Sequence, residues 1–271
     1  MNPTARIGNV EFGSGRLAVI AGPCLAESLP LCLQIARHVA EICRKLEIGY
    51  VFKASYDKAN RTSLSASRGP GLEEGLRWLA QVRAEVGVPV ISDVHEPAQA
   101  IAAGETLDAL QIPAFLCRQT DLLLAAGRSG KAVSVKKGQF VAPAAMRFAV
   151  DKVRSTGNAN VLLTDRGACF GYDNLVSAFR AIPQMRPFAP VIFDATHSVQ
   201  QPGSAGVTGG AREFVPILAQ AAMAAGADGL FLETHPDPDH AASDAASQWP
   251  LEDMERLLRR CRDIYHVARR D

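Results

Sequence analysis

The stretch Val191-Ile192-Phe193-Asp194-Ala195-Thr196-His197-Ser198 joins a short apolar run to three chemically reactive side chains. Residues 191–193 have the composition of a buried β-strand, and an acid, a hydroxyl and an imidazole follow at its C-terminal end. In parallel α/β proteins this end of the strands carries the binding and catalytic groups. The stretch therefore predicts a buried strand that delivers polar side chains to a functional edge.

Seven other apolar runs of the chain end in polar or reactive residues in the same way. These runs are residues 17–20, 50–52, 88–91, 109–110, 132–135, 161–163 and 229–232. Segments with apolar residues at helical spacing separate them; the clearest are residues 28–46, with Ser28 as a candidate N-cap, and residues 250–269. Eight strands that alternate with helices predict a (β/α)8 TIM barrel, formed by a single domain over residues 1–271.

Three further segments carry structural predictions of their own. Residues 1–16 predict an N-terminal β-hairpin that caps the bottom of the barrel, with Gly13-Ser14-Gly15 as its turn signal. The sixth helix is expected near residues 174–181. Residues 68–75 (RGPGLEEG) are similar to a dinucleotide fingerprint, the one feature that favours a Rossmann sheet. The last glycine of this segment comes one position late, and its proline and acids suit a pyrophosphate poorly.

The composition excludes several classes of partner. The formal net charge of the 271 residues is +1 and aromatic residues make up only 6%, so we expect no nucleic-acid partner and no membrane partner. None of the six cysteines has CxxC spacing, and the sequence has neither a signal-peptide pattern nor a membrane-spanning pattern. Reduced thiols in a cytoplasmic protein fit these features best.

Five basic residues follow the ends of expected strands. They are Lys53, Lys58, Arg61, Lys136 and Arg166. In a barrel they converge on one mouth, and converging cations without matching acids form a site for phosphate or carboxylate groups. Two groups, one around Lys58 and Arg61 and one around Lys136 and Arg166, predict two anionic ligand groups. The alternative is that these residues are solvated charges of surface loops.

A second set of side chains has the chemistry of metal ligands. Cys24, His197 and Glu233 stand at or just beyond the ends of the first, seventh and eighth strands, which are neighbours in a closed barrel. Asp244, in the loop after the eighth strand, is a candidate fourth ligand. A thiolate, an imidazole and carboxylates together suit a divalent transition metal such as Fe, Mn, Co or Zn. The alternatives are a small buried cysteine and a hydrogen-bonded core histidine.

Two further candidates lie on loops. Asp93 and His95 follow the third strand, where they are predicted to contact the hydroxyls of a sugar substrate. His235, Asp237, Asp239 and His240 form either a second metal cluster or a solvated loop spaced by prolines.

Seven motifs along the chain belong together. They are Ala21-Gly22-Pro23-Cys24, residues 52–63 (FKASYDKANRTS), 68–71 (RGPG), 111–121 (QIPAFLCRQTD), 135–140 (VKKGQF), 193–198 (FDATHS) and 233–238 (ETHPDP). With these motifs the chain resembles the 3-deoxy-D-manno-octulosonate 8-phosphate synthase family over nearly its whole length. The Lys58-Ala59-Asn60-Arg61 stretch is specific, because it separates this family from the related synthase that uses erythrose 4-phosphate.

The resemblance implies a homotetrameric TIM-barrel enzyme that condenses phosphoenolpyruvate with arabinose 5-phosphate and water. The reaction releases phosphate and serves the synthesis of the lipopolysaccharide sugar KDO. By analogy, phosphoenolpyruvate is held by Lys53, Lys58, Gln111, Lys136 and Arg166, and the aldose phosphate by Asn60, Arg61 and Thr62. The implied metal ligands are Cys24, His197, Glu233 and Asp244. The implied catalytic residues are His197, Lys58, Asp244 and Cys24. Cys24 indicates the metal-dependent subclass, because the metal-independent enzymes carry asparagine there.

The chain departs from the family pattern at two places. Where the family usually has Ser-Asp-Gly-Pro-Asn, this chain has Ser243-Asp244-Ala245-Ala246-Ser247, and loss of the glycine is expected to shift the loop that carries Asp244. Thr164-Asp165-Arg166 replaces the frequent Thr-Glu-Arg, a smaller change. Two alternatives to the metal-dependent synthase stay open. One is the same reaction without an essential metal, and the other is a non-catalytic barrel that binds sugar phosphates.

Overall fold

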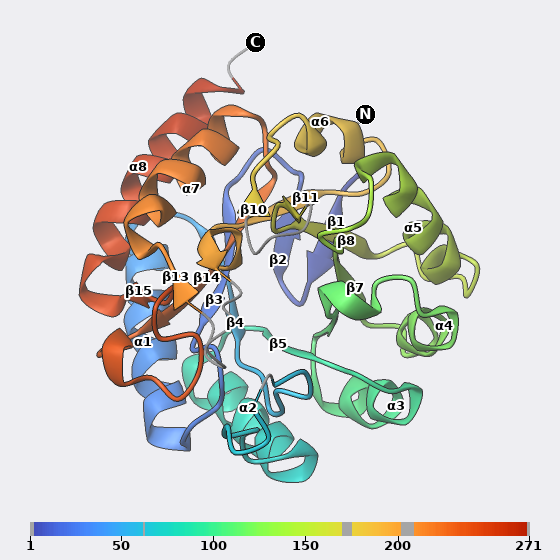
Figure 1. Cartoon of the computed structure of the whole chain (residues 1–271), viewed down its shortest axis with the longest axis horizontal. Coiled ribbons are helices and arrows are strands. Elements are labelled where there is room, and N and C mark those ends of the chain that lie inside the picture. Colours follow the sequence, from blue (N-terminus) through green and yellow to red (C-terminus); the bar gives the residue numbers. More distant parts are fainter. Residues whose placement is uncertain (1–2, 62, 170–174, 202–208, 270–271) are drawn as a thin grey trace.

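Eight parallel strands close into a barrel at the centre of the computed structural model, which describes residues 3–61, 63–169, 175–201 and 209–269 (Figure 1). The strands are β3 (Ala18–Gly22), β4 (Gly49–Lys53), β5 (Val90–Asp93), β6 (Ala109–Ile112), β7 (Ala132–Lys136), β8 (Val161–Asp165), β11 (Val191–Asp194) and β14 (Gly229–His235). Each strand pairs in parallel with the next, and β14 pairs with both β11 and β3, which closes the sheet. The predicted TIM barrel and its eight predicted strands are confirmed.

Helices cover the outside of the barrel. They are α1 (Leu29–Lys45), α2 (Leu72–Val86), α3 (Pro97–Thr106), α4 (Thr120–Arg128), α5 (Met146–Arg154), α6 (Ala181–Met185), α7 (Val215–Ala224) and α8 (Met254–Val267). The predicted cap of α1 is confirmed, because the Ser28 hydroxyl accepts a hydrogen bond from the backbone N–H of Leu31 at 3.3 Å. No helix in the described part of the chain is long and apolar enough to cross a membrane.

The sixth helix is shorter than predicted and begins later. Residue 174 lies outside the described residues, and Leu175–Val176 form strand β10, which pairs antiparallel with β9 (Ala168–Cys169). The helix begins only at Ala181, where the prediction ended it. Pro183 then falls in the first turn, a position at which the missing N–H costs no helical hydrogen bond.

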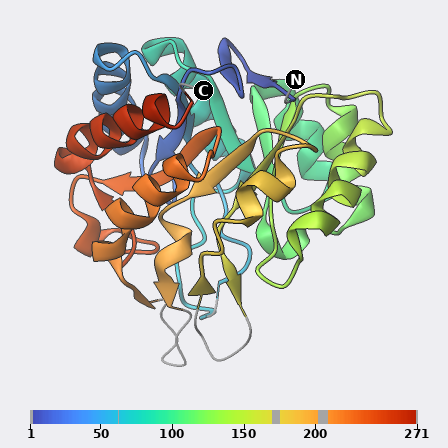
Figure 2. The same cartoon turned by 90° about the horizontal axis from the view of Figure 1, so that it is seen from above.

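Short strands and single 3₁₀ turns occupy the connections. The strands are β12 (Gln200–Gln201), β13 (Gly209–Gly210) and β15 (Trp249–Pro250). The 3₁₀ turns are Ala114–Leu116, Pro143–Ala145, His197–Val199, Arg212–Phe214, Pro238–His240 and Leu251–Asp253. Figure 2 shows β9, β10, β12 and β13, in gold and orange, at the end of the barrel opposite to the dark blue N-terminal segment.

Side chains of the barrel strands point alternately into the lumen and out toward the helices. A cluster of apolar side chains fills the lumen; its barrel members include Ile20, Val51, Ile91, Ala109, Ala132, Leu162, Ile192 and Phe231. In seven of the eight strands the next inward position, two residues further on, is a buried polar residue. These positions are Lys53, Asp93, Gln111, Ser134, Thr164, Asp194 and Glu233. The pleat of the strands therefore gathers polar groups at the carboxyl end of the lumen.

The predicted N-terminal hairpin is present, but its turn lies earlier than Gly13-Ser14-Gly15. Strands β1 (Ala5–Ile7) and β2 (Val10–Phe12) pair antiparallel with Ile7 opposite Val10, so residues 8–9 form the turn. Gly8 supplies the positive φ of 57° that such a tight turn requires. The apolar side chains of both strands join the lumen cluster, and the hairpin therefore closes the amino end of the barrel.

Asp228, in the turn before β14, connects several elements at the amino end of the barrel. Its Oδ2 accepts a hydrogen bond from the backbone N–H of Val191 at 2.9 Å. Its two carboxylate oxygens also accept hydrogen bonds from Arg186 and Arg269. The buried carboxylate thereby ties β11 to the residues that follow α6 and α8. The guanidinium groups compensate the cost of removing its charge from water.

Replacing Asp228 by alanine is expected to lower the free energy of unfolding by about 3 kcal/mol. The change leaves two partly buried guanidinium groups and the N–H of Val191 without their acceptor. Urea unfolding at fixed protein concentration measures this loss. Asp253→Ala, which breaks an exposed pair with Arg256, is the matched control and should cost less than about 1 kcal/mol. Equal losses in the two variants would contradict the anchoring role of Asp228.

Candidate active site

Three potential ligand atoms from distant parts of the chain lie together at the carboxyl end of the barrel. Cys24 follows β3, Glu233 occupies an inward position of β14, and Asp244 lies in the loop after β14. One ligand atom from each lies within 4.8 Å of the other two. The Cys24 Sγ is 3.2 Å from the Asp244 Oδ2. The pairing of Glu233 with Gly22 across β14 and β3 makes this approach possible.

His197 approaches the same three residues from the end of β11. Its Nε2 lies 3.4 Å from Glu233 Oε2 and 3.6 Å from Asp244 Oδ2. On the other side of the ring, Nδ1 lies 2.8 Å from Asp194 Oδ2, and the backbone N–H of His197 donates to Asp194 Oδ1 at 2.8 Å. A carboxylate that accepts the Nδ1 proton leaves the lone pair of Nε2 directed at the other ligands, as in many metal-binding histidines.

The electrostatics of Cys24, His197, Glu233 and Asp244 fit a bound cation. Burial, together with the charges of Asp244 and Glu233, raises the pKa of the Cys24 thiol well above its ordinary value. The Glu233 Oε2 is buried and has no hydrogen-bond partner. A divalent transition metal accepts this donor set of a thiolate, an imidazole and two carboxylates. Its charge would stabilise the thiolate that the two acids otherwise disfavour.

The loop that carries Asp244 reaches the site despite the loss of the family's glycine. The positive φ of the loop, 49°, falls on Asp244 itself and not on Ala245, so a glycine is not required there. The side chain of Gln248 connects the loop to the backbone of Cys24. Its Oε1 accepts the backbone N–H of Cys24 at 3.3 Å, and its Nε2 donates to the carbonyl of Ser243 at 2.8 Å. The loop thus places Asp244 beside Cys24, and the expected shift relative to the family stays a prediction.

Three of the predicted cations have acid partners, contrary to the expectation of cations without matching acids. Lys53 Nζ lies 2.7 Å from Glu233 Oε1, and Lys58 Nζ lies 3.9 Å from the same oxygen. Lys136 Nζ lies 2.6 Å from Asp194 Oδ2. The sequence did not reveal these pairs because the acids stand on β11 and β14, more than fifty residues from each lysine. Burial raises the pKa of Glu233, but the charges of His197 and the lysines outweigh it, so its pKa is well below the ordinary value.

Arg61 and Arg166 differ from the lysines, because neither has an acid within 4.0 Å among the described residues. Arg166 donates to the carbonyl of His197 at 3.2 Å and to the side chain of Gln200, and its Nε is buried without a partner. Arg61 donates to the hydroxyl of Ser243 at 2.8 Å. These two guanidinium groups are the uncompensated positive charges of the site, and each is able to bind an anionic group.

The other residues that are predicted to bind substrate differ in their burial. Asp93 and Gln111 are buried, and the atoms Asp93 Oδ1 and Gln111 Oε1 have no hydrogen-bond partner, as expected of groups that face a ligand. Asn60 is exposed. Thr62 lies outside the described residues. Among the described residues, the structure therefore gathers most of the predicted set, and Asn60 is its exposed member.

Several residues of the site were not predicted from the sequence. Asp194 orients His197, Thr196 accepts the backbone N–H of Glu233 at 2.8 Å, and Ser243 and Gln248 contact Cys24. The alternation of β11 was a sufficient signal for Asp194, since Ile192 and Asp194 share the inward face. The possible second metal cluster is not observed: among the described residues the one group of metal-ligand type is Cys24, Glu233 and Asp244.

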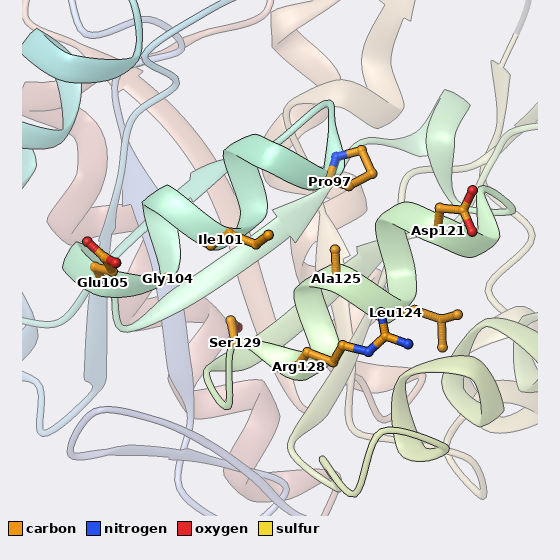
Figure 3. Close-up of a pocket in the computed structure, with 9 residues that line it drawn as sticks. All are labelled: Pro97, Ile101, Gly104, Glu105, Asp121, Leu124, Ala125, Arg128 and Ser129. Carbon is orange, nitrogen blue, oxygen red and sulfur yellow. The ribbon is translucent and has the colours of Figure 1, made fainter.

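A hollow of about 530 Å³ lies on the outer wall of the barrel, between α3 and α4 (Figure 3). Pro97, Ile101, Asp121, Leu124 and Arg128 are among the residues that line it. None of the predicted site residues lines this hollow, so it is separate from the candidate active site.

Known proteins resemble this chain over almost its whole length. The chain matches the model of the DAHP synthetase I family over residues 3–267. It is 58% identical over 258 residues to the 2-dehydro-3-deoxyphosphooctonate aldolase of Koribacter versatilis, with 93% of this chain and 92% of that protein covered. The proteins of the same name from Syntrophotalea carbinolica and Rhodopseudomonas palustris (strain HaA2) are 56% and 54% identical. These alignments cover 96% and 99% of this chain and 95% of each relative.

Replacing His95 by asparagine is expected to lower the free energy of unfolding by about 1–2 kcal/mol near pH 6. His95 Nε2 lies 3.1 Å from Asp93 Oδ2. Burial lowers the pKa of His95, but the hydrogen bond and the charge of Asp93 outweigh it and raise the pKa. For Asp93, burial raises the pKa, but His95 and two lysines outweigh it and lower the pKa.

The direction in which stability changes with pH follows from the raised pKa of His95 and the lowered pKa of Asp93. The contribution of Asp93 is present above its ordinary pKa and is lost as the pH falls through the lowered value. The contribution of His95 is full below its ordinary pKa and is lost as the pH rises through the raised value. Urea unfolding from pH 5 to 9 should therefore show the largest effect of His95→Asn near pH 5–6, with a decline at higher pH. The exposed His38 provides the control variant, and an effect of His95→Asn that is constant over this range would refute the ion pair.

Proposed function

This chain belongs to the DAHP synthetase I family, and we propose that it condenses phosphoenolpyruvate with arabinose 5-phosphate and water. The products are 3-deoxy-D-manno-octulosonate 8-phosphate (KDO 8-phosphate) and inorganic phosphate. The observation that carries this conclusion is the 58% identity to a 2-dehydro-3-deoxyphosphooctonate aldolase over 93% of the chain. The protein is thus a 3-deoxy-8-phosphooctulonate synthase, a transferase that forms a carbon–carbon bond for the synthesis of KDO.

The two substrates each carry a phosphate, and the site has two uncompensated guanidinium groups. We assign Arg166, with Lys53, Lys58, Gln111 and Lys136, to phosphoenolpyruvate. Arg61, with Asn60 and Thr62, is assigned to the phosphate of the aldose. The assignment is supported by the separate contacts of the two guanidinium groups: Arg166 donates to the carbonyl of His197, and Arg61 donates to the hydroxyl of Ser243. Asp93, with its free Oδ1, is assigned to a sugar hydroxyl.

In the reaction, the C3 carbon of phosphoenolpyruvate uses its double-bond electrons to attack the aldehyde carbon of the aldose. The aldehyde oxygen becomes an alcohol, water adds to C2 of the former phosphoenolpyruvate, and phosphate leaves from C2. The enol carbon is a weak nucleophile, so the two anionic substrates must be held close together. Lys136 and Arg166 offset the negative charges that would otherwise repel each other, in a site where burial strengthens each interaction.

We further propose that Cys24, His197, Glu233 and Asp244 hold a divalent transition metal such as Fe, Mn, Co or Zn. When bound, such a cation supplies Lewis acidity for the aldehyde carbonyl. Asp194 holds the His197 ring through Nδ1, and Lys53 fixes one oxygen of Glu233, so that Oε2 stays available to the metal. The buried Cys24 beside two carboxylates is the feature that argues against the same reaction without an essential metal.

We infer that the chain acts as one domain, in the cytoplasm, within a homotetramer. The tetramer is supported by large apolar side chains that are exposed on the outer loops and helices of the barrel. They include Ile101, which is 64% exposed in the hollow between α3 and α4, Phe115 at 57% and Phe148 at 58%. Burial of such side chains against a second copy removes apolar surface from water.

Phosphate release should require both phosphoenolpyruvate and arabinose 5-phosphate, and removal of the metal should abolish it. The protein is stripped with a chelator, and Fe²⁺, Mn²⁺, Co²⁺ or Zn²⁺ is then added singly. We expect activity to fall at least 100-fold on stripping and to return with particular metals, because the bound cation would supply the Lewis acidity for the aldehyde carbonyl. Erythrose 4-phosphate in place of the pentose phosphate tests the specificity.

The possible outcomes separate the proposals. Full activity in the stripped protein would retain the synthase and reject the essential metal. No phosphate release with any metal or aldose would reject the synthase and favour a barrel that only binds sugar phosphates. Cys24→Ser should weaken metal binding, whereas Cys43→Ser, at a cysteine buried on α1, should not.

Replacing Arg61 and Arg166 should affect different substrates. Arg61→Ala is expected to raise the KM for arabinose 5-phosphate about 10- to 100-fold, and Arg166→Ala to raise the KM for phosphoenolpyruvate by a similar factor. The reason is that each change removes charge-assisted hydrogen bonds to a single anion. Steady-state kinetics with each substrate varied in turn measures the split, and Arg37→Ala, at an exposed pair with Glu85, is the control. If both variants raised both KM values equally, the assignment would be wrong.

A further inference from the structure

The hydroxyl of Ser243 lies between a guanidinium group and a thiol. Its Oγ is 2.8 Å from Arg61 Nη1 and 3.0 Å from Cys24 Sγ. Ser243 is buried, at 4% exposure, and it directly precedes Asp244. One small side chain thus contacts both the residue assigned to the aldose phosphate and a residue assigned to the metal.

The direction of the hydrogen bonds follows from the chemistry of the three groups. A guanidinium N–H can only donate, so the Ser243 oxygen accepts from Arg61. A hydroxyl has a single proton, and a cysteine that binds a metal is a thiolate without one. With a metal bound, the Ser243 proton is therefore donated to the sulfur of Cys24. Because hydrogen bonds in a chain polarise one another, donation from Arg61 makes Ser243 a stronger donor to that sulfur.

The contacts of Arg61 leave it free to exchange this partner. Besides Ser243, it donates to the carbonyls of Ser67 at 2.7 Å and Ala242 at 3.5 Å, and these acceptors are all neutral. A phosphate dianion accepts hydrogen bonds from a guanidinium more strongly than a neutral hydroxyl does. An incoming aldose phosphate therefore competes with Ser243 for Arg61.

We propose that Ser243 is a positioning residue that couples recognition of the aldose phosphate at Arg61 to the metal–thiolate bond at Cys24. This inference rests on the proposed function, in which Arg61 binds the aldose phosphate and Cys24 binds the metal. When the phosphate draws Arg61 away, Ser243 donates less strongly and the sulfur becomes richer in electrons. Since coupling between two binding sites is reciprocal, the metal must alter the affinity for the aldose phosphate by the same factor by which the aldose phosphate alters the affinity for the metal.

The test uses the full chain loaded with Co²⁺, which reports a thiolate ligand through a sulfur-to-metal charge-transfer band in the near ultraviolet. Ser243→Ala removes the hydrogen bond to sulfur, and we expect the band to move to longer wavelength and the Co²⁺ affinity to fall about 10- to 100-fold. Arabinose 5-phosphate should shift the wild-type band in the same direction and leave the band of Ser243→Ala unmoved. Ser243→Thr keeps the hydroxyl and should restore both the band position and its response.

Two controls distinguish the proposed coupling from other effects on the charge-transfer band. Ser247→Ala removes a buried hydroxyl from the same loop, but that hydroxyl contacts the carbonyl of Asp244 and not Cys24. Equal effects of Ser243→Ala and Ser247→Ala on the band would overturn the coupling in favour of a general loosening of the loop. Arabinose without phosphate should leave the wild-type band unmoved, because only the phosphate competes for Arg61.

The remaining outcomes distinguish the coupling from the function on which it rests. A Cys24-dependent band that neither Ser243→Ala nor arabinose 5-phosphate shifts would overturn the coupling and leave the metal site intact. Absence of the band in the wild type, as in Cys24→Ser, would overturn the coupling together with the assignment of Cys24 as a ligand. Phosphate release by the same Co²⁺-loaded protein is measured separately and decides the synthase activity alone.

Discussion

The pairing of the last barrel strand with the first is the constraint on which the candidate site depends. Cys24 and Asp244 are separated by 220 positions in sequence, yet their side chains lie 3.2 Å apart. The register that opposes Glu233 to Gly22 sets this approach. It also requires glycine at position 22, because a Cβ there would lie 2.0 Å from the carbonyl oxygen of Lys53. The backbone hydrogen bonds that close the barrel thus determine where the side chains of the candidate site lie.

Among the described residues at the carboxyl end of the barrel, the predicted site lysines lie near acids, whereas Arg61 and Arg166 have no acid partner. Lys136 is buried over the ring of Phe231, 3.8 Å from its centre, and burial outweighs its acid neighbours and lowers its pKa. Its partner Asp194 has a lowered pKa, because His197 and Lys136 outweigh the effect of burial. Such pairs offset the cost of desolvation and leave little net charge at each lysine. Arg61 and Arg166, whose partners are neutral oxygens, therefore carry most of the net positive charge that attracts anions, and the paired lysines add hydrogen-bond donors.

The sequence predicted those features that local patterns determine. The eight strands followed from apolar runs with polar ends, and the helix after Ser28 followed from its period and its cap. The predicted position of the hairpin turn was wrong because two segments have the composition of a turn. Gly13-Ser14-Gly15 is one of them, but the turn between β1 and β2 forms at Gly8.

Tertiary contacts were the other limit on the predictions. No spacing rule relates Lys53 to Glu233, or Gln248 to the backbone of Cys24, since these contacts arise only once the barrel closes. The alternation of inward positions would have identified Asp194, but the shape of the loop around Asp244 depends on packing against Cys24 and Ser243.

The positive φ of Asp244 has a consequence for how this site can change in evolution. Aspartate and asparagine are the side-chain-bearing residues that adopt this left-handed conformation most readily, because their short polar groups bond locally to the backbone. One residue therefore sets both the shape of the loop and a negative charge beside Cys24. Glutamate would keep the charge and strain the backbone, and glycine would keep the backbone and lose the carboxylate. Asparagine and glycine both remove the charge without refolding the loop, but only asparagine keeps a side-chain oxygen at this position, so few substitutions change the ligand chemistry without changing the loop.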